Sequence, residues 1–128
     1  MSGILFLCIH NAGRSQMAAG FARELAGEEV LILSGGSEPA DSVNPVAIDV
    51  MNEVGIDISQ FVPQKYNDDL LNAVDVVVTM GCGDTCPYIP GKRYVDWPLD
   101  DPKGKPLEDV RRIRDEIKTH VTELLAQL

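Results

Sequence analysis

The sequence predicts an α/β fold, a single three-layer domain in which a four-stranded parallel sheet is flanked by helices. Short apolar runs typical of buried strands occur at residues 4–8, 30–34 and 74–79, with a weaker run at 93–95. Segments with helical or mixed spacing separate the first three runs, and this alternation is typical of parallel strands joined by crossover helices. The length of 128 residues fits one domain over residues 1–128 and is too short for two ordinary ones.

The first helix is expected from about Arg14 to about Leu25. Apolar side chains such as Met17 and Phe21 recur at helical spacing along this segment. Gly27 follows where a helix end is expected, because glycine readily adopts the left-handed backbone that terminates helices. The helix therefore begins directly after the first strand and its short loop.

Three further helical segments are expected in chain order. Pro45 favours a helix start with Asn44 as its N-cap, and Gly55 ends that helix. Residues 68–73 are expected to form a short helical turn. The longest helix is predicted over residues 108–128, where apolar positions three and four apart are typical of a helix that packs on a core.

The composition is that of a globular chain with an acidic balance. Hydrophobic residues make up 45% and charged residues 24%, and no apolar stretch approaches the roughly 18 residues of a membrane span. The first apolar run is short and lacks a basic leader, so we expect no signal peptide and a cytoplasmic location. The formal net charge of −9 disfavours nucleic acid and membrane partners. An anion site in this chain must therefore rely on local donors.

A Cys-x5-Arg-Ser motif stands where the first strand meets the first helix. The five residues between Cys8 and Arg14 are Ile9, His10, Asn11, Ala12 and Gly13. A loop of this length can curl so that its backbone N–H groups point inward, and the N-terminus of the following helix adds a positive dipole end. Asn11 suits such a loop because asparagine tolerates left-handed backbone. The motif therefore predicts a site for a tetrahedral oxyanion.

Two side chains of the motif extend this prediction. Arg14 offers a planar fork that can hold two oxygens, and Ser15 can donate a hydrogen bond to the sulfur of Cys8. These donors favour a thiolate, so Cys8 is the predicted nucleophile. The alternative is that Cys8 is only a small buried residue at a strand end.

Two more cysteines, Cys82 and Cys86, follow the third strand in a segment with two glycines. Without an export signal, three cysteines leave catalytic, redox and metal roles open. The pair fits a redox couple, half of a zinc site, or two packed thiols. In a helix their Cβ atoms would lie about 5–6 Å apart, beyond the roughly 3.5–4.5 Å of a disulfide, so bonding requires local unwinding. We expect no bound metal and no cofactor.

An acidic pair precedes a proline after the fourth strand. Asp100 and Asp101 stand before Pro102, where a carboxyl group could lean over the anion site and give a proton to a leaving oxygen. Aspartate before proline is also ordinary turn chemistry. The two histidines are weaker candidates, because the backbone of His10 matters more to the loop than its ring, and His120 is expected on the exposed side of the last helix.

Three stretches together, residues 8–18, 79–87 and 100–102, resemble those of an arsenate reductase of the thioredoxin-coupled type, within the low-molecular-weight protein tyrosine phosphatase-like family. The resemblance covers nearly the whole chain and implies that fold. It implies reduction of arsenate to arsenite, with phosphate or sulfate as mimics of the substrate. The resemblance implies that Cys8 is the nucleophile, that Arg14 and the loop amides bind the oxygens, and that Ser15 tunes the thiol. It also implies a general acid at Asp101. Finally, it implies a Cys8–Cys82–Cys86 disulfide relay that thioredoxin regenerates.

The chain departs from that pattern at several points. Cys82 and Cys86 are closer together than in the better-known thioredoxin-coupled members, and Ala19 stands where some members place an acidic ligand for potassium. Three other functions stay open. A small thiol such as mycothiol or glutathione could replace the relay, leaving Cys8 alone essential. A tyrosine phosphatase would leave two cysteines idle, and Lys103 stands where such enzymes have a tyrosine. A sensor would bind oxyanion or arsenite without turnover.

Overall fold

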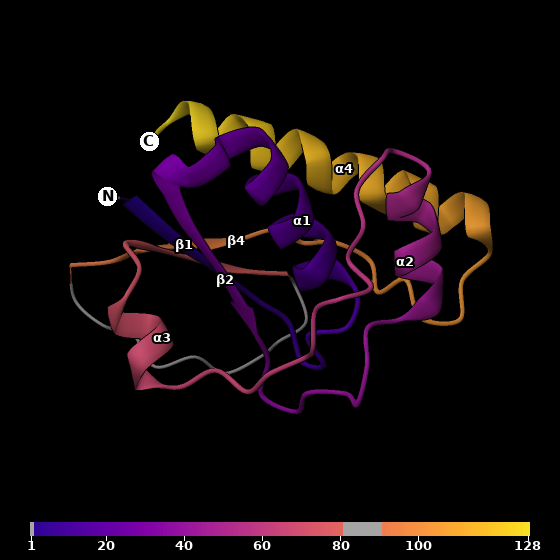
Figure 1. The fold of residues 1–128 in the computed structure, drawn as a ribbon, viewed down its shortest axis with the longest axis horizontal. Coiled ribbons are helices and arrows are strands. Elements are labelled where there is room, and N and C mark those ends of the chain that lie inside the picture. Colours follow the sequence, from indigo (N-terminus) through magenta and orange to yellow (C-terminus); the bar gives the residue numbers. More distant parts are fainter. Residues whose placement is uncertain (1, 81–90) are drawn as a thin grey trace.

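The computed structural model describes residues 2–80 and 91–128. Its sheet has four parallel strands in the order β2-β1-β3-β4 (Figure 1). The strands are β1 (Ser2–Leu7), β2 (Val30–Gly35), β3 (Val76–Thr79) and β4 (Arg93–Asp96). The helices are α1 (Arg14–Ala26), α2 (Pro45–Asn52), α3 (Asp68–Asn72) and α4 (Leu107–Ala126), with a 3₁₀ turn, η1 (Gly27–Glu29), after α1.

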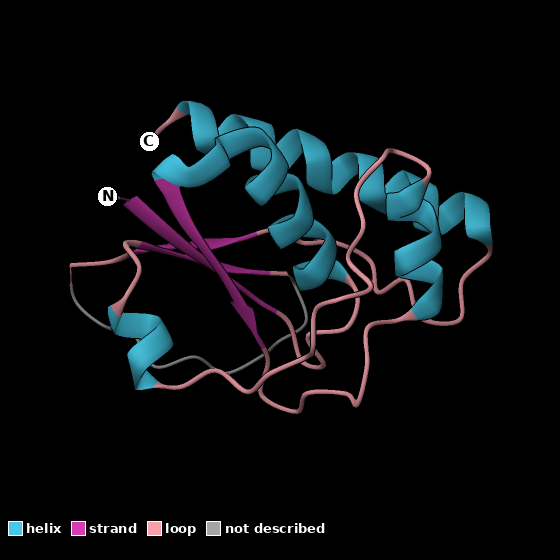
Figure 2. Cartoon of the chain, in the orientation of Figure 1, coloured by secondary structure: helices cyan, strands magenta, loops and turns pink. Residues whose placement is uncertain are grey.

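Helices cover both faces of the sheet, as the three-layer prediction requires. Figure 2 shows α1, α2 and α4 on one side of the strands and α3 on the other. The core divides accordingly, since Phe6 packs with the α1 and α4 side chains whereas Leu5 and Leu7 pack with Leu71 of α3. The predicted fold class is therefore confirmed.

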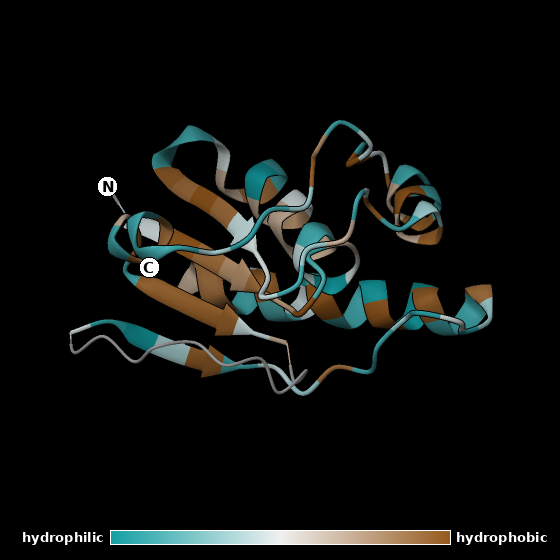
Figure 3. Cartoon of the chain, turned by 90° about the horizontal axis from the view of Figure 1, so that it is seen from below, coloured by the Kyte–Doolittle hydropathy of each residue, from teal (hydrophilic) through white to brown (hydrophobic). Residues whose placement is uncertain are grey.

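The central strand β1 explains why the first apolar run is unbroken. It pairs with β2 on one side and β3 on the other, and both of its faces are covered. Strands buried on both faces carry continuous apolar runs rather than an alternating pattern. Figure 3 shows apolar residues concentrated along β1 and its neighbours β2 and β3. Cys8 therefore lies directly after the C-terminal end of β1, a strand that is buried on both faces.

The helix boundaries match the sequence predictions closely. Gly27 follows α1 with φ 63°, and the side chain of Asn44 accepts a 2.9 Å hydrogen bond from the N–H of Val46 at the start of α2. β3 begins at Val76 rather than at residue 74, because its pairing with β1 starts opposite Ile4. No helix in the described parts of the chain is long and apolar enough to cross a bilayer.

His120 differs from its prediction. It is half-buried, and its ring stacks on Trp97 with centroids 5.0 Å apart and an interplanar angle of 17°. Trp97 also contacts Phe6 of β1, at 5.8 Å between centroids. The expectation of an exposed ring was wrong because Trp97, directly after β4, extends the core to a face of α4 that helical periodicity alone marks as polar.

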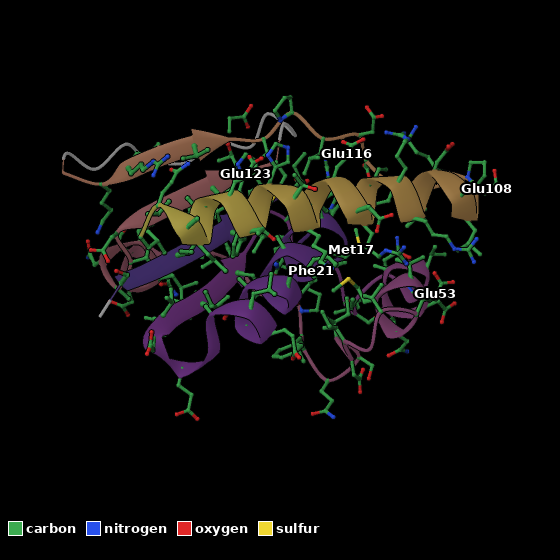
Figure 4. All side chains as sticks on the ribbon, turned by 90° about the horizontal axis from the view of Figure 1, so that it is seen from above. Met17, Phe21, Glu53, Glu108, Glu116 and Glu123 are labelled. Atoms are coloured by element: carbon green, nitrogen blue, oxygen red, sulfur yellow. The ribbon has the colours of Figure 1, made fainter. Side chains whose placement is uncertain are left out.

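A cluster of charges joins the end of α2 to α4. Glu53 accepts hydrogen bonds from Arg111 Nε, at 3.0 Å to Oε1 and 3.2 Å to Oε2, and from Arg111 Nη2, at 2.8 Å to Oε2. It also accepts one of 2.9 Å from Arg114. Arg114 also donates to the carbonyl of Val50 at 2.9 Å. Figure 4 shows Glu53 beside α4. The hydrogen bond from Arg111 is the largest cause that lowers the pKa of Glu53 from 4.5 to about 2.

The depressed pKa of Glu53 predicts a specific acid sensitivity. Its stabilising contribution is present above about pH 4.5, the value in the unfolded chain, and is lost as the pH falls toward about 2. Glu53→Gln should remove this part of the pH dependence of the free energy of unfolding, measured by urea titration at several pH values. Glu123→Gln, on α4, is the control and should keep the parent dependence.

Candidate active site

The loop between β1 and α1 turns its carbonyl groups outward. Each trans peptide places its N–H opposite its C=O, so the N–H groups of residues 10–14 point to the inside of the loop. Such a ring of N–H groups is an anion cradle. The outward bonds run to Ile9 O from Glu38 N (2.9 Å), His10 O from Ala40 N (3.0 Å), Asn11 O from Gln16 Nε2 (3.1 Å), Ala12 O from Asn44 N (2.8 Å) and Gly13 O from Met17 N (3.0 Å).

The segment 36–44 supplies three of these donors and lies directly against the loop. Gly36 makes the approach possible, because a Cβ at this position would collide with the carbonyl oxygens of Cys8 and Ile9. Gly36 is itself held by a 2.9 Å hydrogen bond from its N–H to the carbonyl of Gln64. Gly36, directly after β2, is thus needed for close packing of two backbones.

Asn11 is the internal support of the loop. It is fully buried and has φ 49°, the left-handed backbone expected from the sequence. Its Oδ1 accepts from the N–H of Gln64 at 3.0 Å, and its Nδ2 donates to Ser15 Oγ at 2.7 Å. Because Ser15 accepts this bond, its own proton is free for Cys8 Sγ, which lies 2.9 Å from Ser15 Oγ. The arrangement can stabilise a thiolate at Cys8.

Arg14 is held from behind, and its other edge makes no hydrogen bond within the described residues. Its Nη1 donates to the carbonyl of Met80 at 2.9 Å and to that of Leu99 at 3.0 Å, which uses both protons of that nitrogen. The Nε and Nη2 groups form the remaining fork. The side chain is buried yet lines the cavity described below. Arg14 is thus positioned to bind two oxygens of a tetrahedral anion.

The two neighbouring aspartates have different surroundings. Asp101 lines the cavity, and its Oδ2 lies 4.0 Å from Arg14 Nη2. Its Oδ1 accepts from the N–H of Lys103 at 3.0 Å, and its side chain is 58% exposed. Asp100 instead faces α4, where it pairs with Arg112 at 3.4 Å. Asp101 is therefore the carboxyl group that is placed for proton transfer.

A cavity of about 740 Å³ opens above the loop. Cys8 and Arg14 lie in its lining, together with residues 40–46 in part and residues 101–105. Among the described residues, its charged lining consists of the three cations Arg14, Lys103 and Lys105 and the carboxylate of Asp101. The local charge is thus positive although the chain as a whole carries −9. Lys103 and Lys105 were not identified as site residues in the sequence, where only their place beside the Asp-Pro turn could have indicated them.

The other two cysteines, Cys82 and Cys86, lie outside the described residues. The described chain stops at Met80, whose carbonyl binds Arg14, and resumes at Gly91. The pairing of Cys82 and Cys86 with Cys8 stays a prediction from the sequence. The site built above consists of the loop, Ser15, Arg14 and Asp101.

Gly36→Ala is expected to disrupt this site. The added methyl group meets two backbone carbonyl oxygens, which cannot move aside as a side chain does. Overpacking of this kind costs about 1–3 kcal/mol. Thermal unfolding should show a lower midpoint, and calorimetric titration should show weakened phosphate binding. Ser37→Ala, at the next position, adds no atom and should leave both measurements near those of the parent; equal effects of the two changes would contradict the packing argument.

Comparison with known proteins gives a consistent set of relatives. A profile of the "Low molecular weight phosphotyrosine protein phosphatase" family matches residues 3–128. "Arsenate reductase 2" of Staphylococcus haemolyticus is 45% identical over 122 residues, covering 92% of each chain. A thioredoxin-dependent arsenate reductase of Corynebacterium glutamicum superposes with a TM-score of 0.88 at 40% identity, over 99% of this chain and 61% of that longer one. An arsenate reductase solved "in the phosphate binding state" gives 0.86 at 39% identity, over 99% and 98%.

Proposed function

This chain belongs to the low-molecular-weight phosphotyrosine protein phosphatase family, and we propose that it acts within that family as an arsenate reductase. The observation that carries the proposal is the loop whose N–H groups surround the position in front of Cys8. Ser15 lies on the sulfur, and the Nε and Nη2 groups of Arg14 lie beside it. Relatives with 40–45% identity bear the name arsenate reductase. A relative solved with phosphate supports phosphate as a mimic of arsenate.

The first step is nucleophilic attack at arsenic. The thiolate of Cys8 forms a sulfur–arsenic bond, one arsenic–oxygen bond breaks, and Asp101 gives its proton to the departing oxygen. Arsenic remains As(V) in this adduct. The N–H groups of residues 10–14 and the fork of Arg14 hold the other oxygens, so charge that develops there is met by donors already in place.

The second step reduces arsenic. The thiolate of Cys82 attacks Cys8 Sγ, a sulfur–sulfur bond forms, and the sulfur–arsenic bond breaks with its electron pair on arsenic. Arsenite, As(III), leaves, and the two sulfurs are oxidised to a Cys8–Cys82 disulfide. Cys86 then attacks Cys82, which frees Cys8 and leaves a Cys82–Cys86 disulfide.

A dithiol protein of the thioredoxin class reduces that last disulfide and supplies the two electrons of the cycle. Free thiols of this kind fit the reducing cytoplasm. A small-thiol system is the alternative donor. Hydrolysis of phosphate esters accounts for fewer of these residues than arsenate reduction does, because it gives Cys82 and Cys86 no role. In addition, Lys103 follows Pro102 at the position where an aromatic ester would need an aromatic neighbour.

Reconstitution tests the proposal directly. Purified protein with arsenate, NADPH, thioredoxin and thioredoxin reductase should oxidise NADPH and release many equivalents of arsenite per protein. Cys8→Ser should abolish both signals, because a serine hydroxyl is a poor nucleophile and cannot form a disulfide. A parallel assay with glutathione or mycothiol and its redoxin identifies the donor. Near-parent turnover by Cys8→Ser would refute the assignment.

Asp101→Asn tests the general acid, with Asp100→Asn as its matched control. The amide keeps the shape of Asp101 but has no acidic proton, so kcat should fall roughly 10²–10⁴-fold while phosphate binding changes little. Asp100 pairs with Arg112 on the exposed side of the turn, so its substitution should leave kcat near the parent value. The reverse ranking would assign the acid to Asp100.

Cys86→Ser tests the relay. This variant should reduce one equivalent of arsenate in a single turnover and then stop as a Cys8–Cys82 disulfide, which peptide mass mapping identifies. Cys82→Ser should instead stop at the arsenic adduct. Full multiple turnover by both variants with a small thiol would show that the two cysteines are bystanders and that Cys8 is the only essential sulfur.

A further inference from the structure

We propose that the ring of His10 is a general base that deprotonates the thiol attacking Cys8 Sγ in the second step. The inference rests on the proposed function and assigns the proton of the attacking thiol, which the second step described above leaves unassigned. It does not depend on whether that thiol belongs to the protein or to a small molecule, because the base acts on any thiol entering the cavity.

The ring of His10 is fixed in one tautomer. Its Nδ1 lies 3.0 Å from the backbone carbonyl oxygen of Glu38. A carbonyl oxygen only accepts hydrogen bonds, so Nδ1 carries the proton and Nε2 of the neutral ring carries a lone pair. The neighbouring backbone secures the contact, because Glu38 N–H donates to Ile9 O and Ala40 N–H donates to His10 O. A histidine whose Nδ1–H is held by a carbonyl oxygen presents its Nε2 for proton transfer.

The position of His10 suits a base that deprotonates an incoming thiol rather than Cys8. It is an exposed residue that lines the same cavity as Cys8, whereas the sulfur of Cys8 is buried and already has Ser15 as its partner. A thiol that enters this cavity therefore meets His10 and Cys8 in the same lining. Of residues 2–80 and 91–128, the charged side chains that share the cavity are Arg14, Asp101, Lys103 and Lys105.

The second step needs such a base. Only a thiolate attacks the adduct, and a free cysteine thiol is about 3% ionised at pH 7. A carboxylate is a poor acceptor for a thiol proton because their ordinary pKa values differ by about 4–5 units, whereas an imidazole differs by about 2. The proton moves from the attacking sulfur to Nε2 and then to solvent. The new disulfide forms at Cys8 Sγ as arsenite leaves with the bonding electron pair.

Two substitutions separate this role from a merely positional one. His10→Asn retains an amide N–H where Nδ1 stood, so it can still donate to Glu38 O, but it has no base at the Nε2 position. His10→Gln places an amide near the Nε2 position and also lacks the base. Both are made in a Cys82→Ser/Cys86→Ser chain, so that an added thiol is the sole attacking group.

The experiment compares two added thiols in single-turnover release of arsenite. Glutathione, whose thiol is largely protonated at pH 7, should react about 10–30-fold more slowly with His10→Asn than with the parent. The deficit should shrink as the pH rises past the ionisation of that thiol. The aryl thiolate 5-thio-2-nitrobenzoate needs no base, and with it the two proteins should agree within about twofold.

Several results would overturn the inference. An equal loss with both thiols would mean that His10 only positions the loop, and unchanged rates with both would mean that the ring has no part in the step. His10→Gln must show the same dependence on the thiol, which guards against a folding defect peculiar to His10→Asn. The reconstitution assay with the unaltered chain tests the proposed function separately, because that chain keeps Cys82 and Cys86. If it turns over arsenate while the His10 comparison shows no dependence on the thiol, this inference alone fails, so the two failures are distinguishable.

Discussion

The outward direction of the loop carbonyls is the constraint on which the rest of the site depends. A carbonyl oxygen turned inward would place lone pairs against the oxyanion, so each carbonyl needs a partner outside the loop. Glu38, Ala40 and Asn44 supply these partners from the segment after β2. Asn11 holds the loop from within and orients Ser15 toward Cys8. The anion cradle is therefore a property of two packed segments and not of the motif alone.

The charge distribution resolves an apparent conflict between substrate and protein. A chain of net charge −9 repels anions at long range. Salt screens that field beyond about 8–10 Å, so the charges nearest the bound anion dominate. In the part of the chain that the structure describes, those charges at the cavity are Arg14, Lys103 and Lys105 against one carboxylate, Asp101. Other acidic side chains lie away from the cavity. Glu53, for example, forms ion pairs with Arg111 and Arg114, and these pairs connect the end of α2 to α4.

Local sequence determined the elements and the reacting loop. Strands and helices could be placed within one or two residues because apolar periodicity, Asn44 as a cap and Gly27 as a helix end act over a few neighbouring residues. The Cys8-to-Ser15 motif is equally local, so its nucleophile, its arginine and the left-handed Asn11 could be proposed from spacing. The wider family followed from the order of three such motifs along the chain.

Tertiary structure alone decided which side chains meet. Arg14 is anchored by the carbonyls of Met80 and Leu99, far away in sequence, and no local pattern records that contact. The same holds for Asp101 facing the cavity while Asp100 faces Arg112, and for His120 stacking on Trp97. Adjacent residues with identical chemistry are indistinguishable in a sequence. Their roles separate only when packing gives each a different neighbour, because burial and hydrogen bonding act through space rather than along the chain.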